Sequence, residues 1–126
     1  ALEMGQIEGG FVQGQGWLTI EEVNWKSNGQ ITTFSPSTYK IPAVSDIPKI
    51  FNVEIFKRGR NTENVVNKAK TTGEPPLMLA MSVFFAIKDA IASVGKYKLI
   101  PKIDGPATSE KILISLKDLK SRINYN

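Results

Sequence analysis

Residues 77–91 are the most apolar part of this chain of 126 residues, and a helix built from them is apolar on almost every side. The apolar side chains are Leu77, Met78, Leu79, Met81, Val83, Phe84, Phe85, Ile87 and Ile91. A helix of this kind is normally buried inside a large protein, and a free-standing domain of this size has too little mass to surround it. The sequence therefore predicts one part of a larger protein, with this helix buried.

The same stretch does not predict a membrane span. Its most apolar run, from Leu77 to Ile87, is shorter than the roughly 18–20 residues that a span requires, and Lys88 and Asp89 end it. The N-terminal residues also lack the basic region and apolar core of a signal peptide. We therefore expect no membrane partner.

The sequence Gly-Glu-Pro-Pro at residues 73–76 starts this helix, which we expect to run to about Val94. Proline suits a first helical turn, where its missing N–H is not needed for a hydrogen bond. The proline after Glu74 disfavours helical backbone angles at that residue and places its carboxylate at the mouth of the helix, where the helix dipole favours the ionised form. Such a carboxylate can act as a general base, but the spacing alone favours a helix-capping acid.

The N-terminal segment is rich in glycine, with five of the ten glycines of the chain at positions 5, 9, 10, 14 and 16. Ile7, Phe11 and Leu18 follow helical spacing and predict a helix from about residue 4 to residue 21. A glycine inside a helix costs up to about 1 kcal/mol, so the close approach of another backbone or of a ligand is needed to explain them. Tight helix packing is the favoured explanation, and a cofactor surface is the alternative.

The middle of the chain carries signals for strands. Asn28 and Gly29 lie between two β-prone runs and predict a hairpin, and residues 51–56 predict a further strand. The proline-rich residues 35–48 predict an extended loop, and a short amphipathic helix should begin at about Thr108. We therefore predict an α+β fragment of a larger domain, with a glycine-rich helix, a hairpin, one more strand, a buried apolar helix and a C-terminal helix.

The chain contains no cysteine and no histidine. Their absence excludes thiolate and imidazole metal sites, Fe–S ligation, Cys or His nucleophiles and the Ser-His-Asp triad. Acid–base chemistry must then come from carboxylates, Lys or Tyr. A chain without cysteine is compatible with a reducing compartment, and we expect a cytoplasmic location.

The charge is unevenly distributed. Residues 1–56 carry three basic and six acidic side chains, whereas residues 57–126 carry thirteen basic and six acidic ones. The lysines of the basic half are spread singly, without interleaved aromatic residues, which favours a solvated surface over a nucleic-acid-binding face. One hypothesis from these features is a non-catalytic interaction module, a basic α+β domain that docks on a partner through its apolar helix.

Five motifs in order carry a resemblance to a known family. They are Gly5–Gly14, Pro36–Pro42, Gly73–Leu77, Phe84–Ala90 and Pro106–Thr108. Taken together they make the chain resemble the C-terminal part of the molybdenum-binding region of xanthine dehydrogenase, aldehyde oxidase and related molybdenum hydroxylases. Residues 1–126 would then be the C-terminal portion of a molybdopterin-binding domain.

The resemblance implies roles for individual residues. Glu74 matches the glutamate that serves this family as catalytic base, and Gln6 matches a glutamine beside the molybdenum centre and its pterin. Gly9 and Gly10 would let the helix backbone approach the cofactor, and Gly73 would give clearance next to Glu74. None of these residues is implied to be a metal ligand.

The resemblance also implies an activity, the oxidative hydroxylation of purines (hypoxanthine or xanthine) or of aldehydes. The complete enzyme would hold molybdopterin here, with Fe–S clusters and FAD on other domains or subunits. The partners would be the rest of the catalytic subunit and those domains, without nucleic acid. We expect the isolated chain to bind no cofactor, to be inactive, and to form a homodimer or self-associate through exposed apolar surface.

Overall fold

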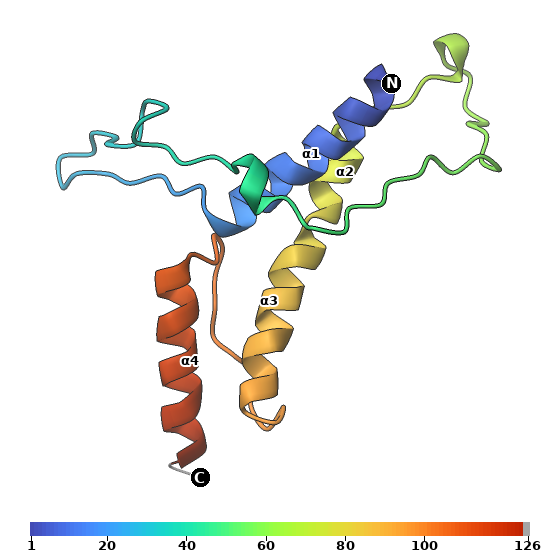
Figure 1. The fold of residues 1–126 in the computed structure, drawn as a ribbon. Coiled ribbons are helices and arrows are strands. Elements are labelled where there is room, and N and C mark those ends of the chain that lie inside the picture. Colours follow the sequence, from blue (N-terminus) through green and yellow to red (C-terminus); the bar gives the residue numbers. More distant parts are fainter. Residues whose placement is uncertain (125–126) are drawn as a thin grey trace.

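The computed structural model describes residues 1–124 and is built from helices joined by long loops (Figure 1). The elements are α1 (Leu2–Thr19), η1 (Val44–Asp46), η2 (Val66–Lys68), α2 (Glu74–Leu79), α3 (Met81–Val94) and α4 (Ser109–Asn124). Helix α1 crosses α2, α3 continues beyond α2, and α4 lies beside α3. The loops before and after η1 extend to opposite sides of α1 (Figure 1).

The β part of the predicted fold is wrong, because residues 1–124 contain no strand. Asn28 and Gly29 do form a turn, with Gly29 at a φ of 81°. The pairing beyond that turn is limited to one isolated antiparallel bridge between Trp25 and Ile31. A two-stranded hairpin is marginally stable without a third strand or a covering helix, and this one has neither in the described part of the chain.

Residues 51–56 are also not a strand. The segment is irregular, and its Phe51 ring packs on the Phe11 ring of α1 with 5.4 Å between the ring centroids. Strand-prone residues form a ladder only where another strand edge offers N–H and C=O groups. No such edge lies beside this segment within residues 1–124.

Helix α1 agrees closely with the helix predicted for residues 4–21, and two of its glycines explain how it packs. A Cβ added to Gly10 would lie 2.5 Å from the Gly73 carbonyl oxygen. A Cβ added to Gly14 would collide with the Leu77 carbonyl oxygen and lie 2.8 Å from the Cβ of Ala80. The backbones of α1 and α2 therefore touch, so tight packing, the favoured explanation, accounts for these two glycines.

The apolar helix is interrupted, and most of it is exposed in this chain alone, so its burial in a larger protein stays a prediction. Ala80 separates α2 from α3 and is fully buried against α1. In α3 only Ile91 is buried, whereas 59% of the Phe85 surface is exposed. The cover that the sequence pattern anticipates is not supplied by residues 1–124.

The helical stretch Glu74–Val94 is 21 residues long and apolar enough to cross a membrane by length and composition alone. It passes this test because the helix continues on both sides of the run from Leu77 to Ile87. Core helices of soluble proteins pass the same test, so the finding assigns no membrane role.

Helix α4 starts one residue after the predicted Thr108, whose Oγ1 accepts a hydrogen bond from the Lys111 N–H at 3.4 Å. Leu119 is the largest fully buried apolar residue in the described chain, and it lies close to Gly95 at the end of α3. The Ala107 N–H donates to the Leu18 carbonyl at 2.7 Å and ties the start of α4 to the end of α1. The core is thus small. It consists of the glycine contact between α1 and α2 and of the side-chain contact between the end of α3 and α4.

Candidate functional site

A cleft of about 300 Å³ lies between residues 5–13 of α1 and the start of α2. It is lined by Gly5, Gln6, Gly9, Gly10, Gln13, Gly73, Glu74 and Leu77. All five residues that the sequence analysis singled out as catalytic or cofactor-binding, Gln6, Gly9, Gly10, Gly73 and Glu74, are therefore brought together. Gly5, Gln13 and Leu77 were given no role in the sequence analysis.

The α1 side of the cleft follows from helix geometry. Residues advance by about 100° per position around an α-helix, so Gly10 and Gly14 share one side and Gly5 and Gly9 share the neighbouring one. Gly10 and Gly14 contact α2, whereas a Cβ added to Gly5 or Gly9 would meet no heavy atom within 4 Å. The first pair fixes the two helices in contact, and the second pair leaves an open surface beside that contact.

The α2 side of the cleft carries the only carboxylate in its lining. Glu74 is the first residue of α2, its side chain is exposed, and within residues 1–124 it makes no hydrogen bond or ion pair. The N-cap residue of α2 is Gly73, and Glu74 is the acidic residue of the first turn, where its charge complements the helix dipole without a capping hydrogen bond among the described residues. The carboxylate therefore lines the cleft without a partner among residues 1–124.

One contact between the two helices places residues of both at the cleft. Gly73 contributes its carbonyl oxygen to the contact with Gly10, and the next residue is Glu74. Pro75 and Pro76 follow within the first turn of α2, where proline fixes the backbone at helical angles. Backbone packing thus sets the position of the Glu74 backbone relative to α1.

Residues 1–124 offer no cluster of His, Cys, Asp or Glu at the cleft. Among residues 1–124 there is no group of three or more His, Cys, Asp or Glu side chains placed to hold a metal ion. The polar side chains in the lining are two amides and one carboxylate.

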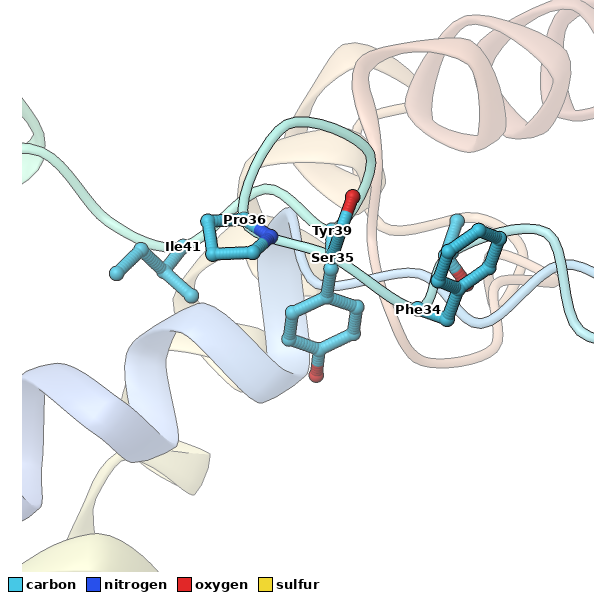
Figure 2. A pocket seen from close by; sticks show the side chains of 6 residues that line it. Phe34, Ser35, Pro36, Tyr39 and Ile41 are labelled. Atoms are coloured by element: carbon cyan, nitrogen blue, oxygen red, sulfur yellow. The ribbon is translucent and has the colours of Figure 1, made fainter.

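A larger hollow of about 510 Å³ lies away from this cleft, in the proline-rich loop (Figure 2). Its lining residues are Thr33, Phe34, Ser35, Pro36, Tyr39 and Ile41. None of them belongs to the predicted site, and Figure 2 shows their side chains projecting from a single loop. The lining contains no carboxylate and no cation, and its one titratable side chain is Tyr39.

Two buried polar residues that the sequence analysis assigned no function hold this loop on α1. The Tyr39 hydroxyl donates to the buried Glu21 carboxylate at 2.6 Å, which raises the pKa of Tyr39 above its ordinary value of 10.0. The buried Gln15 donates from Nε2 to the Asp46 carbonyl at 2.6 Å. These long-range contacts have no local sequence signal, because the partners lie 18 and 31 residues apart.

Comparisons with known proteins identify relatives of this chain. Residues 1–48 match the family described as "Molybdopterin cofactor-binding domain". Xanthine dehydrogenase/oxidase of Felis catus is 43% identical over 98% of this chain, and xanthine dehydrogenase of Oryza sativa subsp. japonica is 42% identical over 94%. Nicotinate hydroxylase of Emericella nidulans is 40% identical, also over 94%. The chain spans 10%, 9% and 8% of these relatives.

Proposed function

This chain belongs to the xanthine dehydrogenase family as a segment of its molybdopterin-binding region, and we propose that it contributes the catalytic base of an oxidative hydroxylation. The base is Glu74. The observation that carries the proposal is the cleft itself, where the only carboxylate of the lining has no partner among residues 1–124 and lies beside Gln6, Gly9 and Gly10.

Molybdopterin fits this cleft by two features of the lining. Gly5 and Gly9 leave space that a Cβ would enter, which suits the close approach of a flat group to the helix. The absence of a metal-ligand cluster within residues 1–124 suits a metal that is held by its own organic group. Gln6 would donate or accept hydrogen bonds beside it. When bound, the group supplies the oxygen nucleophile and accepts the two electrons removed from the substrate.

The part played by this chain is to move a proton. A carboxylate oxygen of Glu74 accepts the proton of the attacking oxygen as that oxygen forms its bond to the substrate carbon. A positioned general base contributes typically 10²–10⁴-fold to a rate. Because Gly73 packs directly on Gly10, the base is held close to the surface where α1 would contact the cofactor.

The substrate we propose is a purine, hypoxanthine or xanthine, with aldehydes as the alternative class. Several relatives that match nearly the whole chain are named after xanthine, and one is named after nicotinate. The substrates in both names are nitrogen heterocycles, which favours a planar ring in the cleft. Residues that hold such a ring in place would come largely from outside this segment, since the chain spans about a tenth of its relatives.

We also propose that these residues act only as part of a larger protein. The partners would be the rest of the catalytic subunit and domains or subunits that carry Fe–S clusters and FAD, in the cytoplasm. The exposed apolar side chains of α3 and α4, such as Phe85, Leu113 and Ile114, support such a cover. The same surface would drive self-association of the isolated segment. The isolated segment would be inactive, because most of the cofactor site would lie elsewhere in the protein.

The steady-state test uses the full-length protein that carries this segment. Glu74→Gln keeps the size and polarity of the side chain but cannot accept the proton, so kcat should fall at least about 100-fold. Molybdenum and pterin contents should be unchanged. The matched control is Glu8→Gln, because Glu8 is an exposed α1 residue outside the cleft. Near wild-type kcat in Glu74→Gln at full molybdenum loading would refute the assignment.

A further inference from the structure

Gln13 lines the same cleft as Glu74, and nothing above gives it a function. It lies seven positions beyond Gln6 on α1, which is two helical turns and a rise of about 10 Å. The two side chains therefore leave α1 in nearly the same direction. The open surface at Gly9 lies between them.

The contacts between α1 and α2 show where Glu74 lies relative to Gln6 and Gln13. Gly10 is level with Gly73, and Gly14 is level with Leu77, so both contacts advance by four residues and the two helices run in the same direction. Glu74 follows Gly73 by one residue. Its level on α2 is therefore between those of Gln6 and Gln13, and the two amides flank it along α1.

Gln13 has no structural task that would explain its position. It is exposed, and within residues 1–124 its amide makes no hydrogen bond to the protein. Gln15, two residues along, is buried and donates to the Asp46 carbonyl. The two glutamines of this turn therefore differ. Gln15 holds a loop, whereas Gln13 presents a free amide to the cleft.

We propose that Gln13 is a ligand-binding residue, whose amide pairs with the lactam edge of a fused nitrogen heterocycle. This inference rests on the proposed function. A lactam edge carries one N–H donor and one C=O acceptor side by side, and a glutamine amide offers the complementary acceptor and donor. Purine and pterin share this chemistry, so the lactam can belong to the substrate or to the cofactor. Gly9 lets the plane of the ring approach α1 between the two amides.

The test variant is Gln13→Leu in the full-length protein. Leucine removes both hydrogen-bonding groups at similar size and keeps the helix, because leucine is a good helix former. One neutral hydrogen bond corresponds to a change of about 3- to 10-fold in an equilibrium. The control is Gln30→Leu, because Gln30 is an exposed glutamine in the turn near Gly29.

Two readouts distinguish the source of the lactam. A 3- to 10-fold rise in KM for hypoxanthine, with kcat and pterin content unchanged, assigns the contact to the substrate. A fall in pterin and molybdenum content, with unchanged KM in the loaded fraction, assigns it to the cofactor. If KM and both contents stay within twofold of the wild type, as expected for Gln30→Leu, the proposal is overturned.

The outcome is separable from that of the proposed base. If Glu74→Gln retains its kcat while Gln13→Leu raises KM, the cleft binds the ring but Glu74 is not the base. If Glu74→Gln loses kcat while Gln13→Leu changes neither KM nor cofactor content, the base stands and the ligand role of Gln13 fails.

Discussion

The two helix contacts of this chain are built in different ways. Where α1 meets α2, a Cβ on Gly10 or Gly14 would meet backbone carbonyl oxygens. Where α3 meets α4, a Cβ on Gly95 would meet the ends of the Leu119 and Ile123 side chains. Backbone atoms cannot move aside as side-chain ends can. The first contact therefore holds the cleft in one geometry, whereas the second tolerates adjustment.

The largest expected difference comes from adding one methyl group at each contact. Gly14→Ala should destabilise the α1–α2 contact by about 1–3 kcal/mol, because overpacking against backbone forces the helices apart. It should also lower kcat by moving Glu74. Gly95→Ala should cost less, because the side-chain ends can rotate. Hydrogen exchange of the α2 and α3 amides in the full-length protein measures both local stabilities, and equal losses in the two variants would break the comparison.

A second expected effect concerns the exposed side of α3 and α4. Phe85, Leu113 and Ile114 are each more than half exposed, and large apolar patches are rare on soluble monomers. Residues 1–126 expressed alone should self-associate in sedimentation experiments and bind a dye that reports apolar surface. A monomer at high concentration without dye binding would show that this face needs no cover, and would remove the support that it gives to a larger assembly.

The smallest expected effect lies in the loop held by Tyr39. Its hydrogen bond to Glu21 raises the pKa of Tyr39, so the protonated phenol is favoured in the folded state. The contact is fully present below the unfolded pKa of 10.0 and is lost as the pH rises through the higher folded pKa. The phenolate absorbance of Tyr39, obtained by difference from Tyr39→Phe, should therefore appear at higher pH than that of an unfolded tyrosine. Titration at or below the ordinary value would contradict the contact.

The helices could be predicted from the sequence because their signals are local. Apolar spacing places α1, the prolines after Glu74 place the start of α2, and Thr108 places the start of α4. The break at Ala80 was not predicted, and Ala80 lies buried beside Gly14 of α1, a residue distant in the sequence. The predicted strands failed for the same kind of reason, since a strand requires a partner edge that a local pattern does not reveal.

The candidate site could be predicted only through the resemblance. Composition and spacing favoured a capping role for Glu74, and family motifs were needed to connect it with Gln6. The structure adds that these residues line one cleft and that Gln13 lines it too. Gln13 lies in the glycine-rich motif, and its spacing of two turns from Gln6 was a usable signal. The contacts of Gln15 and Glu21 were not predictable, because their partners are distant in sequence.

The central claim is that the carboxylate of Glu74 is the base of the chemical step. The most direct measurement is the rate of anaerobic single-turnover reduction of the full-length protein by hypoxanthine, which isolates that step from later electron transfer. At matched molybdenum content, the rate should fall at least about 100-fold in Glu74→Gln and remain at the wild-type value in Glu8→Gln. Equal rates in the wild type and Glu74→Gln would contradict the claim.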